Sequence, residues 1–339
     1  MCVSAAPARF TDTILYHGRV RHPEHGLVHV LGYQNVAANY ATGPNAMLLH
    51  LPGVGMTQDN FVDTSGARQV LRRMADAIMP RSPGYGMPAP GGAPAGAAPP
   101  PVQVFEHDIY TVVLATNASL IPDALRLVPE HRRIPVNRPL FDFYAQNYPE
   151  HAIALCCFDN RDATRSDPLL LWYVPRHPDR REMPAVDCHT GDVPRIGTSA
   201  PADHCVILGT DEPVSVEPGS WSWHSAPMFW SDSDRSGPVG PFLPDAIVGR
   251  TYTGSLPNGD FMIPHADLLA GRLSAMSRVG PDGEPLPSPL PSTPLPPPPV
   301  PPPPVPPPPV SRPPVPPPPL PPPYMPYRPR RRRWWPFGR

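Results

Sequence analysis

The sequence predicts an α+β fold with a mainly antiparallel sheet and a few helices, αββα layers being one arrangement of them, followed by a disordered, proline-rich arm. Short alternating apolar runs outnumber helical patterns over residues 1–279, and the two kinds are interleaved. Of the 61 prolines, 30 lie in residues 281–339, which hold too few apolar side chains for a core. The expected organisation is a globular body at 1–279, a polyproline arm at 280–327 and a basic, aromatic tip at 328–339.

The N-terminal part predicts four strands. Residues 2–10 and 14–20 flank the polar segment Thr11-Asp12-Thr13, which is typical of a hairpin turn. Residues 27–33 alternate between apolar and polar side chains and predict a third strand. A fourth strand is expected over 46–51.

The next segments combine a helix with a long insertion. Apolar side chains recur at helical spacing over 65–79, and Pro80 ends the pattern. Residues 80–101 are rich in Pro, Gly and Ala and predict a flexible insertion within the body. Strand pattern resumes at 102–116, as one long strand or a hairpin.

The second half of the body predicts two helices and further strands. A helix is expected over 138–148, because Pro139 suits a first helical turn and Pro149 ends the pattern. A last helix is expected over 265–277. Apolar runs predict strands at 151–158, 169–174 and 204–208.

Charge is uneven along the chain. Residues 281–339 carry seven arginines against two carboxylates, a net +5, and the whole chain is −1, so the body is −6. An acidic body argues against nucleic-acid binding by the fold itself. All 28 basic residues are arginine, a composition typical of a high-GC genome, viral or bacterial.

The sequence also indicates the cellular compartment of the protein. The first 20 residues lack the basic start and apolar run of a signal peptide, and no stretch of 18 apolar residues predicts a membrane span. The five cysteines are odd in number and include the adjacent Cys156 and Cys157, which is not typical of a disulfide framework. A cytoplasmic protein without a cofactor is expected.

A zinc-stabilised fold is one hypothesis for the histidines and cysteines. His22, His25 and His29 lie within eight positions, and Cys188-His189 mirrors His204-Cys205. Zinc accepts such mixtures of ligands, but the spacings match no established pattern.

Two other groups have a structural and a functional interpretation. Acidic and histidine side chains could form a polar pocket or support loops through Asx turns; they are Asp187, His189, Asp192 and Asp203. Three tryptophans could bind a ligand, but anchoring a sheet edge is the simpler interpretation; they are Trp221, Trp223 and Trp230.

Cys2 is the candidate nucleophile. Removal of Met1 would leave a thiol and a free α-amine on one residue, and an α-amine can act as the base for its own side chain. Cys2 opens a predicted strand, which would hold it rigidly. The alternative is that Cys2 is a small, buried and inert side chain.

The start of the chain resembles the N-terminal nucleophile hydrolases, in particular the choloylglycine hydrolase and penicillin V acylase branch. The resemblance covers about 20 residues: Met1-Cys2, a strand, a polar turn, and a second strand ending in Tyr16-His17-Gly18-Arg19. It implies hydrolysis of a C–N amide bond, with Cys2 as nucleophile and Arg19 beside it. The family's aspartate after this arginine is absent here. Asn35, Asn39 and Asn45 are available for an oxyanion hole.

The arm predicts protein partners. Proline runs adopt polyproline II, which is already extended before it binds an aromatic-lined groove. Pro321-Pro322-Pro323-Tyr324 matches the pattern that WW domains recognise, and Pro323 to Arg328 matches that of SH3 ligands. The alternative is a spacer without a partner. In the second functional hypothesis, the chain is a non-catalytic adaptor that displays this arm.

The tip predicts a contact with an anionic surface. It interleaves Arg328 and further arginines with Trp334 and Trp335. Arginine binds phosphate, and tryptophan favours membrane interfaces or stacked bases, so an anionic membrane or a nucleic acid would suit both.

Overall fold

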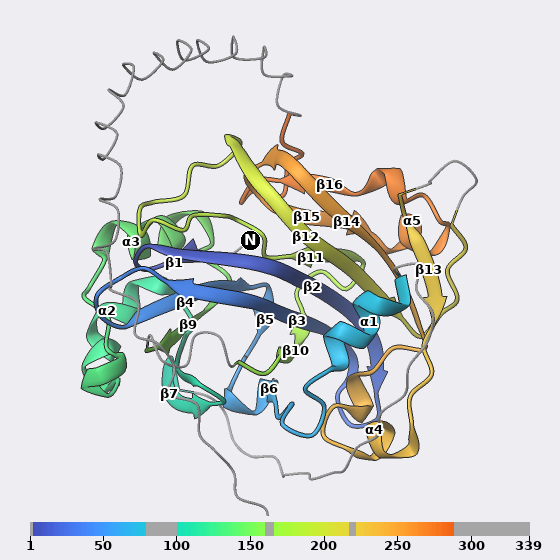
Figure 1. Ribbon diagram of the computed structural model, residues 1–339, viewed down its shortest axis with the longest axis horizontal. Coiled ribbons are helices and arrows are strands. Elements are labelled where there is room, and N and C mark those ends of the chain that lie inside the picture. Colours follow the sequence, from blue (N-terminus) through green and yellow to red (C-terminus); the bar gives the residue numbers. More distant parts are fainter. Residues whose placement is uncertain (1–2, 79–99, 160–165, 217–221, 288–339) are drawn as a thin grey trace, which may run out of the picture. The chain divides into compact units, whose positions relative to one another are not determined.

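The computed structural model describes residues 3–78, 100–159, 166–216 and 222–287 (Figure 1). The chain divides into two compact units, residues 1–291 and 292–339. Every described element lies in the first unit, the body.

Two large sheets build the body. The five-stranded sheet has the order β1-β4-β9-β8-β7, with bounds Val3–Ser4, Asn45–Leu51, Ala152–Phe158, Tyr110–Ala115 and Val102–His107. The eight-stranded sheet has the order β13-β14-β12-β2-β3-β10-β5, with β6 also on β10. Its strands are β13 His224–Pro227, β14 Ala246–Pro257, β12 Ser199–Thr210, β2 Ala8–His22, β3 Gly26–Asn39, β10 Leu169–Pro175, β5 Gly53–Val54 and β6 Phe61–Val62.

A small sheet and short helices complete the body. The three-stranded sheet is β11 Arg180–Met183, β15 Asp260–Pro264 and β16 Ser277–Val279. The α-helices are α1 Val70–Ile78, α2 Ile121–Ala124, α3 Arg138–Asn147, α4 Asp232–Ser236 and α5 His265–Leu269. The 3-10 helices are η1 Gln58–Asn60, η2 Ala118–Leu120, η3 Leu125–Leu127, η4 Glu130–Arg132, η5 Gly240–Phe242 and η6 Leu273–Ala275.

Alternating side chains divide the apolar core into three parts, and these define the layers. One cluster lies between the sheets and includes Leu15, Leu49 and Val206. A second joins the outer face of the five-stranded sheet to α2 and α3. A third joins the outer face of the eight-stranded sheet to α1 and η5. The layers are thus helix, sheet, sheet, helix, which confirms the expected α+β class and its mainly antiparallel sheets.

The centre of the large sheet is one parallel pair in an otherwise antiparallel arrangement. β2 pairs with β3 in antiparallel register from Ala8 to His22, and with β12 in parallel register from Thr13 opposite His204 onward. Figure 1 shows β2, β12 and β14 side by side across the body. This pairing joins the first long strand of the chain to one near its end.

The buried ring of Tyr16 explains why two positions on these strands are glycine. Gly18 and Gly209 are opposite each other on β2 and β12, and the fully buried Tyr16 ring lies against both. A methyl group at Gly18 would overlap the Tyr16 hydroxyl, and one at Gly209 would lie 2.5 Å from it. Both positions therefore need glycine for space.

The predicted N-terminal hairpin is wrong. Residues on both sides of Thr11-Asp12-Thr13 belong to the single strand β2, which stays paired with β3 across this segment. The register shifts between Thr11 and Ile14, and Asp12 has a φ of 52°, so the polar segment is a β-bulge. Polar residues that tolerate positive φ serve bulges and turns alike.

The other predicted elements have mixed outcomes. Strands over 27–33 and 46–51 are confirmed as parts of β3 and β4, and the helix over 138–148 is confirmed as α3. Residues 102–116 form the hairpin β7–β8. The helix over 265–277 is wrong, because Gly271, with a φ of 74°, follows α5 at its end. The insertion at 80–101 lies mostly outside the described residues, as does the arm beyond 287.

Candidate functional site

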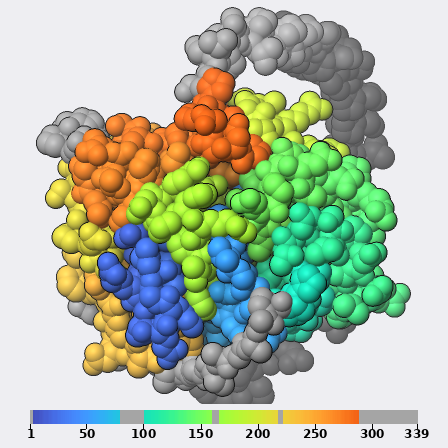
Figure 2. Space-filling view, turned by 180° about the vertical axis from the view of Figure 1, so that it is seen from behind, coloured from blue at the N-terminus to red at the C-terminus, as the bar shows by residue number. Residues whose placement is uncertain are grey.

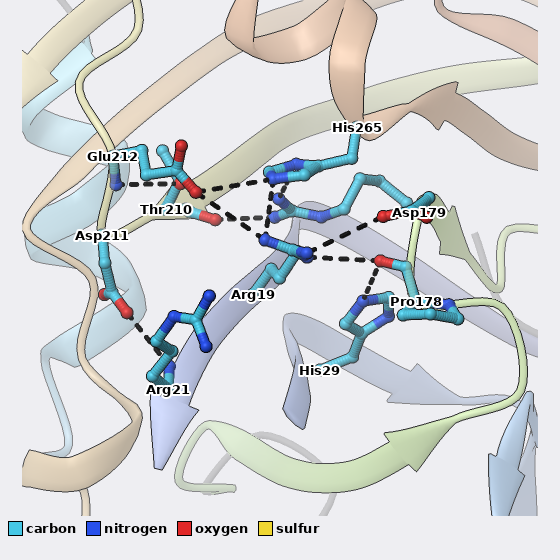
Figure 3. Close-up of polar contacts among 11 residues, drawn as sticks. Arg19, Arg21, His29, Pro178, Asp179, Thr210, Asp211, Glu212 and His265 are labelled. Atoms are coloured by element: carbon cyan, nitrogen blue, oxygen red, sulfur yellow. Dashed lines mark hydrogen bonds and ion pairs between the residues drawn. The ribbon is translucent and has the colours of Figure 1, made fainter. Parts of the chain in front are cut away.

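Arg19 is the one predicted catalytic residue that the structure describes. It lies on β2, with a side chain 16% exposed, in a polar cluster at the end of the large sheet (Figure 3). Its Nε donates to the Pro178 carbonyl at 3.2 Å, and its Nη1 lies 2.9 Å from His265 Nε2. Exposed carboxylates of Asp179 and Glu212 stand 3.7 and 3.8 Å from the guanidinium.

Arg181, on β11, is the inner member of this cluster and is fully buried. Its Nε donates to His17 Nδ1 at 2.9 Å, and its Nη2 donates to the carbonyls of His17 and Gly209 at 2.7 and 2.6 Å. Nη1 lies 3.3 Å from His265 Nδ1. Burial lowers the pKa of Arg181 to about 9, so the guanidinium stays charged at neutral pH.

Three histidines around the arginines are neutral. Burial, and then the charge of Arg181, lowers the pKa of His17 well below its usual value, that of His29 to about 3 and that of His265 to about 4. His17 accepts at Nδ1, so its proton is on Nε2, which faces the Tyr173 hydroxyl at 3.4 Å. His29 Nε2 donates to the Pro178 carbonyl at 3.2 Å.

His265 faces one arginine with each ring nitrogen. A neutral imidazole has one acceptor nitrogen, so it accepts from only one of the two arginines at a time. The shorter contact, 2.9 Å to Arg19, favours Nε2 as the acceptor over Nδ1, which is 3.3 Å from Arg181. His265 thus links the exposed arginine to the buried one.

The cluster joins distant segments of the chain. Its members come from β2, β3, the segment before β11, the end of β12, and α5. At the rim, the Arg21 N–H donates to Asp211 at 3.1 Å, and the Glu212 N–H donates to the Thr210 hydroxyl at 3.1 Å (Figure 3). The polar atoms form hydrogen bonds and ion pairs with one another and with backbone carbonyls, so the cluster stabilises the packing of these segments at the end of the sheet.

A second buried cluster centres on Asp260, which is 1% exposed. One carboxylate oxygen accepts from His50 Nε2 at 2.9 Å and from the Tyr148 hydroxyl at 3.0 Å, and the other accepts from the Ala185 N–H at 2.7 Å. Burial alone would raise the pKa of Asp260, but His50 and these hydrogen bonds lower it. The carboxylate therefore joins β4, α3 and β15 as an anion.

The histidines of the zinc hypothesis do not converge. His22 and His25 stack ring on ring, with centroids 4.5 Å apart and planes 22° apart, and His25 stacks on Trp172. His22 Nδ1 accepts from the Glu24 and His25 N–H groups. Among residues 3–78, 100–159, 166–216 and 222–287, no three His, Cys, Asp or Glu side chains are grouped to hold a metal ion.

The second predicted polar group lines an open groove. Asp187 pairs with His189 at 2.9 Å, and the Thr190 hydroxyl donates to Asp192 at 2.7 Å. Asp187, Thr190 and Asp192 border a groove of about 710 Å³ together with Cys188 and the start of β12. Asp203 is exposed on β12.

The predicted asparagines and tryptophans have structural contacts. Asn45 bonds the Ala6 N–H and carbonyl, at 2.9 and 3.0 Å, and holds the chain between β1 and β2. Trp223 is buried, with its ring centroid 6.3 Å from that of Tyr252. Several predicted residues lie outside the described residues: Cys2, Trp221, Pro321, Pro322, Tyr324, Arg328, Trp334 and Trp335.

The fold and the site define a layered, β-rich protein whose buried charged side chains hold its strands and helices together. No family model and no curated protein matches the sequence. Among solved structures, the chain is similar to baculovirus P35, with a TM-score of 0.41 and 11% identity over 78% of this chain and 99% of that one. Two structures of a mutated P35 after caspase cleavage match with TM-scores of 0.34 and 0.36, each at 11% identity, over 75% and 73% of this chain and 90% and 82% of theirs.

These findings correct the hydrolase assignment. The three solved structures named above are of P35, and none of the three is an N-terminal nucleophile hydrolase. The structure also removes the feature on which the resemblance depended, because the two expected strands are one continuous β2. The assignment to an N-terminal nucleophile hydrolase that acts on a C–N amide bond is wrong.

The residues that sequence reasoning missed are Arg181, His265 and Glu212. They meet Arg19 only through the fold, and in the sequence Arg180-Arg181 resembles an ordinary pair of surface cations. As for membranes, none of the helices in the described part of the chain combines the length and apolar character that a bilayer crossing requires.

Proposed function

We propose that the chain works in the cytoplasm by binding another protein through residues 321–328, with a WW or SH3 domain as the partner. The observation that carries the proposal is the division of the chain where the body ends. Leu286 donates its N–H to the Arg278 carbonyl at 2.7 Å, and the Gly280 N–H donates to Glu284 at 2.9 Å. Residues 292–339 form a separate unit that contains the recognition sequences.

The two recognition sequences overlap but use different residues. The WW pattern needs Pro321, Pro322 and Tyr324, whereas the SH3 pattern needs Pro323, Pro326 and Arg328. Binding to a preformed polyproline II segment costs little conformational entropy, which favours short sequences of this kind. The internal bracing of the body is consistent with a scaffold for the arm.

Titration calorimetry of the full chain with one WW and one SH3 domain tests the proposal. Pro322→Ala with Tyr324→Ala should abolish WW binding and spare SH3 binding. Pro326→Ala with Arg328→Ala should do the reverse. The control is Pro302→Ala with Pro303→Ala, in the proline repeat.

Two outcomes would overturn this function. One is no binding of either domain. The other is equal loss from the control and the motif variants, which would mean that proline content alone is sensed. An active caspase, the enzyme class that cleaved the mutated P35, belongs in the same series. A cut or a stable complex there would replace the WW and SH3 assignment.

The tip supports a second binding mode, to an anionic surface. Six arginines of residues 328–339 accompany Trp334 and Trp335, a combination that suits phosphate groups beside an apolar layer. Sedimentation with phosphatidylcholine vesicles, with and without phosphatidylserine, tests it. Binding should need phosphatidylserine, weaken with salt and be lost in Trp334→Ala with Trp335→Ala. A single-stranded oligonucleotide in place of the vesicles distinguishes nucleic acid from membrane.

A further inference from the structure

The chain offers no side-chain amine. All 28 basic residues are arginine, and the sequence contains no lysine. A high-GC genome favours arginine codons, but the chemical consequence is the same whatever the origin of the composition. Lysine is the residue to which acetyl groups and ubiquitin are attached, so such attachments have no ordinary acceptor along this sequence.

The fold requires arginine at some of these positions. Arg181 donates through Nε and Nη2 to three acceptors. Arg133 donates through Nε and Nη2 to the carbonyls of Val128 and Arg126. One ammonium nitrogen cannot take the places of two guanidinium nitrogens, so a lysine there would leave acceptors unpaired.

At other positions the fold makes no such demand. Arg68 is 67% exposed and pairs with the Asp167 carboxylate at 3.2 Å, a contact that a lysine ammonium could also make. Arg126 is exposed, and Figure 2 shows the green helical segment around it at the surface of the body. Lysine is among the commonest residues of soluble proteins, yet neither position has one. The exclusion of lysine therefore extends beyond what packing requires.

Arginine cannot replace lysine as an acceptor of ubiquitin. Ubiquitin is transferred from a thioester on a cysteine: an amine attacks the carbonyl carbon, a C–N bond replaces the C–S bond, and the proton that the amine loses ends on the released thiol. A guanidinium stays protonated and its lone pairs are delocalised, so it does not attack. Burial lowers the pKa of Arg181 to about 9 and that of Arg278 to about 10, but both side chains are buried away from any enzyme.

We propose that the partner of residues 321–324 is a ubiquitin ligase with a WW domain, which the chain recruits without becoming its substrate. This rests on the WW binding proposed above. A ligand without lysine matters only to a partner that modifies lysine, and this points to a ligase among the proteins that carry WW domains. The recruited ligase stays free to modify itself or a third protein.

Reconstituted ubiquitin transfer tests the proposal. The full chain is mixed with a WW-domain ubiquitin ligase, its activating and conjugating enzymes, ubiquitin and ATP, and the products are separated under reducing conditions. The wild-type chain should carry no ubiquitin while the ligase modifies itself. Arg312→Lys, in the arm before the WW sequence, and Arg126→Lys, on the body, should each create an acceptor and gain ubiquitin.

Matched variants separate the amine from its surroundings. Arg312→Gln removes the same guanidinium without adding an amine, so it should gain no ubiquitin. Pro322→Ala with Tyr324→Ala, added to Arg312→Lys, should lose the conjugate, because the ligase is no longer held. Calorimetry of the same proteins with the isolated WW domain measures binding separately from transfer.

The outcomes distinguish this inference from the function on which it rests. Ubiquitin on the wild-type chain would overturn the inference and leave WW binding in place. So would the absence of ubiquitin on both lysine variants although the WW domain binds. A conjugate on Arg312→Lys that survives Pro322→Ala with Tyr324→Ala would show that the ligase does not use this sequence. No heat of binding with the WW domain would overturn the proposed function itself.

Discussion

Arg181 shows at the scale of one residue how the body accommodates a charge that water cannot reach. Taking a guanidinium out of water is costly unless its donors are paired. Here the carbonyls of His17 and Gly209 and the ring of His17 accept from it. Neutral histidines suit this position, because protonated rings would add charge beside the arginine.

Arg181→Ala should lower the free energy of unfolding by about 3–5 kcal/mol, because it leaves buried acceptors without donors. Arg180→Ala is the matched control, since that neighbouring side chain is 36% exposed and only 3.8 Å from Glu182. Its effect should stay within about 0.5 kcal/mol. Urea denaturation measures both, and equal losses would mean that the buried network does not stabilise the body.

Gly18→Ala should cost about 1–3 kcal/mol, because the new methyl group overlaps the buried Tyr16 hydroxyl. Tyr16→Phe alone should be nearly neutral, since this hydroxyl has no hydrogen-bond partner among the described residues. In the double variant, Tyr16→Phe should restore most of the stability lost at Gly18.

Gly209→Ala is the contrasting case. There a methyl group would lie 2.7 Å from the ring carbon Cε2 of Tyr16 and 2.9 Å from Pro244, which removal of the hydroxyl does not relieve. Tyr16→Phe should therefore rescue Gly209→Ala much less. Thermal unfolding of the three single and two double variants tests this, and equal rescue would contradict the assigned packing.

At the scale of elements, the sequence predicts what depends on local pattern. β3, β4 and α3 have continuous periodicity and clear ends, and each forms close to its expected place. The bulge at Asp12 and the short α5 depend on backbone conformation at single residues, which periodicity does not report. The Arg181 cluster depends on pairing between strands far apart in the sequence, so no local motif could reveal it.

Acid should destabilise the junction of β2, β3 and α5. The pKa of His29 is about 3 and that of His265 about 4 in the folded state, below the value of about 6.5 in an unfolded chain. The unfolded state then binds more protons, so stability is full above about pH 6.5 and is lost as pH falls toward 3–4.

The urea midpoint measured from pH 7.5 to 4.5 tests this. His29→Gln should reduce the slope of the midpoint against pH below 6.5, because one of the titrating groups is gone. Above pH 7 the variant and the wild type should show the same slope. An unchanged slope below 6.5 would show that His29 is not buried as a neutral ring.

At the scale of the whole molecule, the buried members of the three core clusters lie between Val3 and Leu273. Removing residues 288–339 should therefore leave the melting temperature of the body unchanged. Removing residues from 277 onward should prevent folding, because β16 carries the buried Arg278 and Val279. Calorimetry of the two truncations gives the comparison, and a large drop on losing 288–339 alone would contradict it.

The parallel pairing of β2 with β12 has a consequence for folding while the chain is being synthesised. Thr13 leaves the ribosome long before its partner His204 exists. At typical translation rates of about 5–20 residues per second, roughly 10–40 seconds separate the two. During that interval one edge of β2 has no native neighbour. The nascent chain therefore depends on chaperones, or on non-native contacts, to cover that edge. High contact order of this kind also slows folding after release. Expression at reduced temperature, or with a chaperone that binds nascent chains, should raise the soluble yield of the full chain.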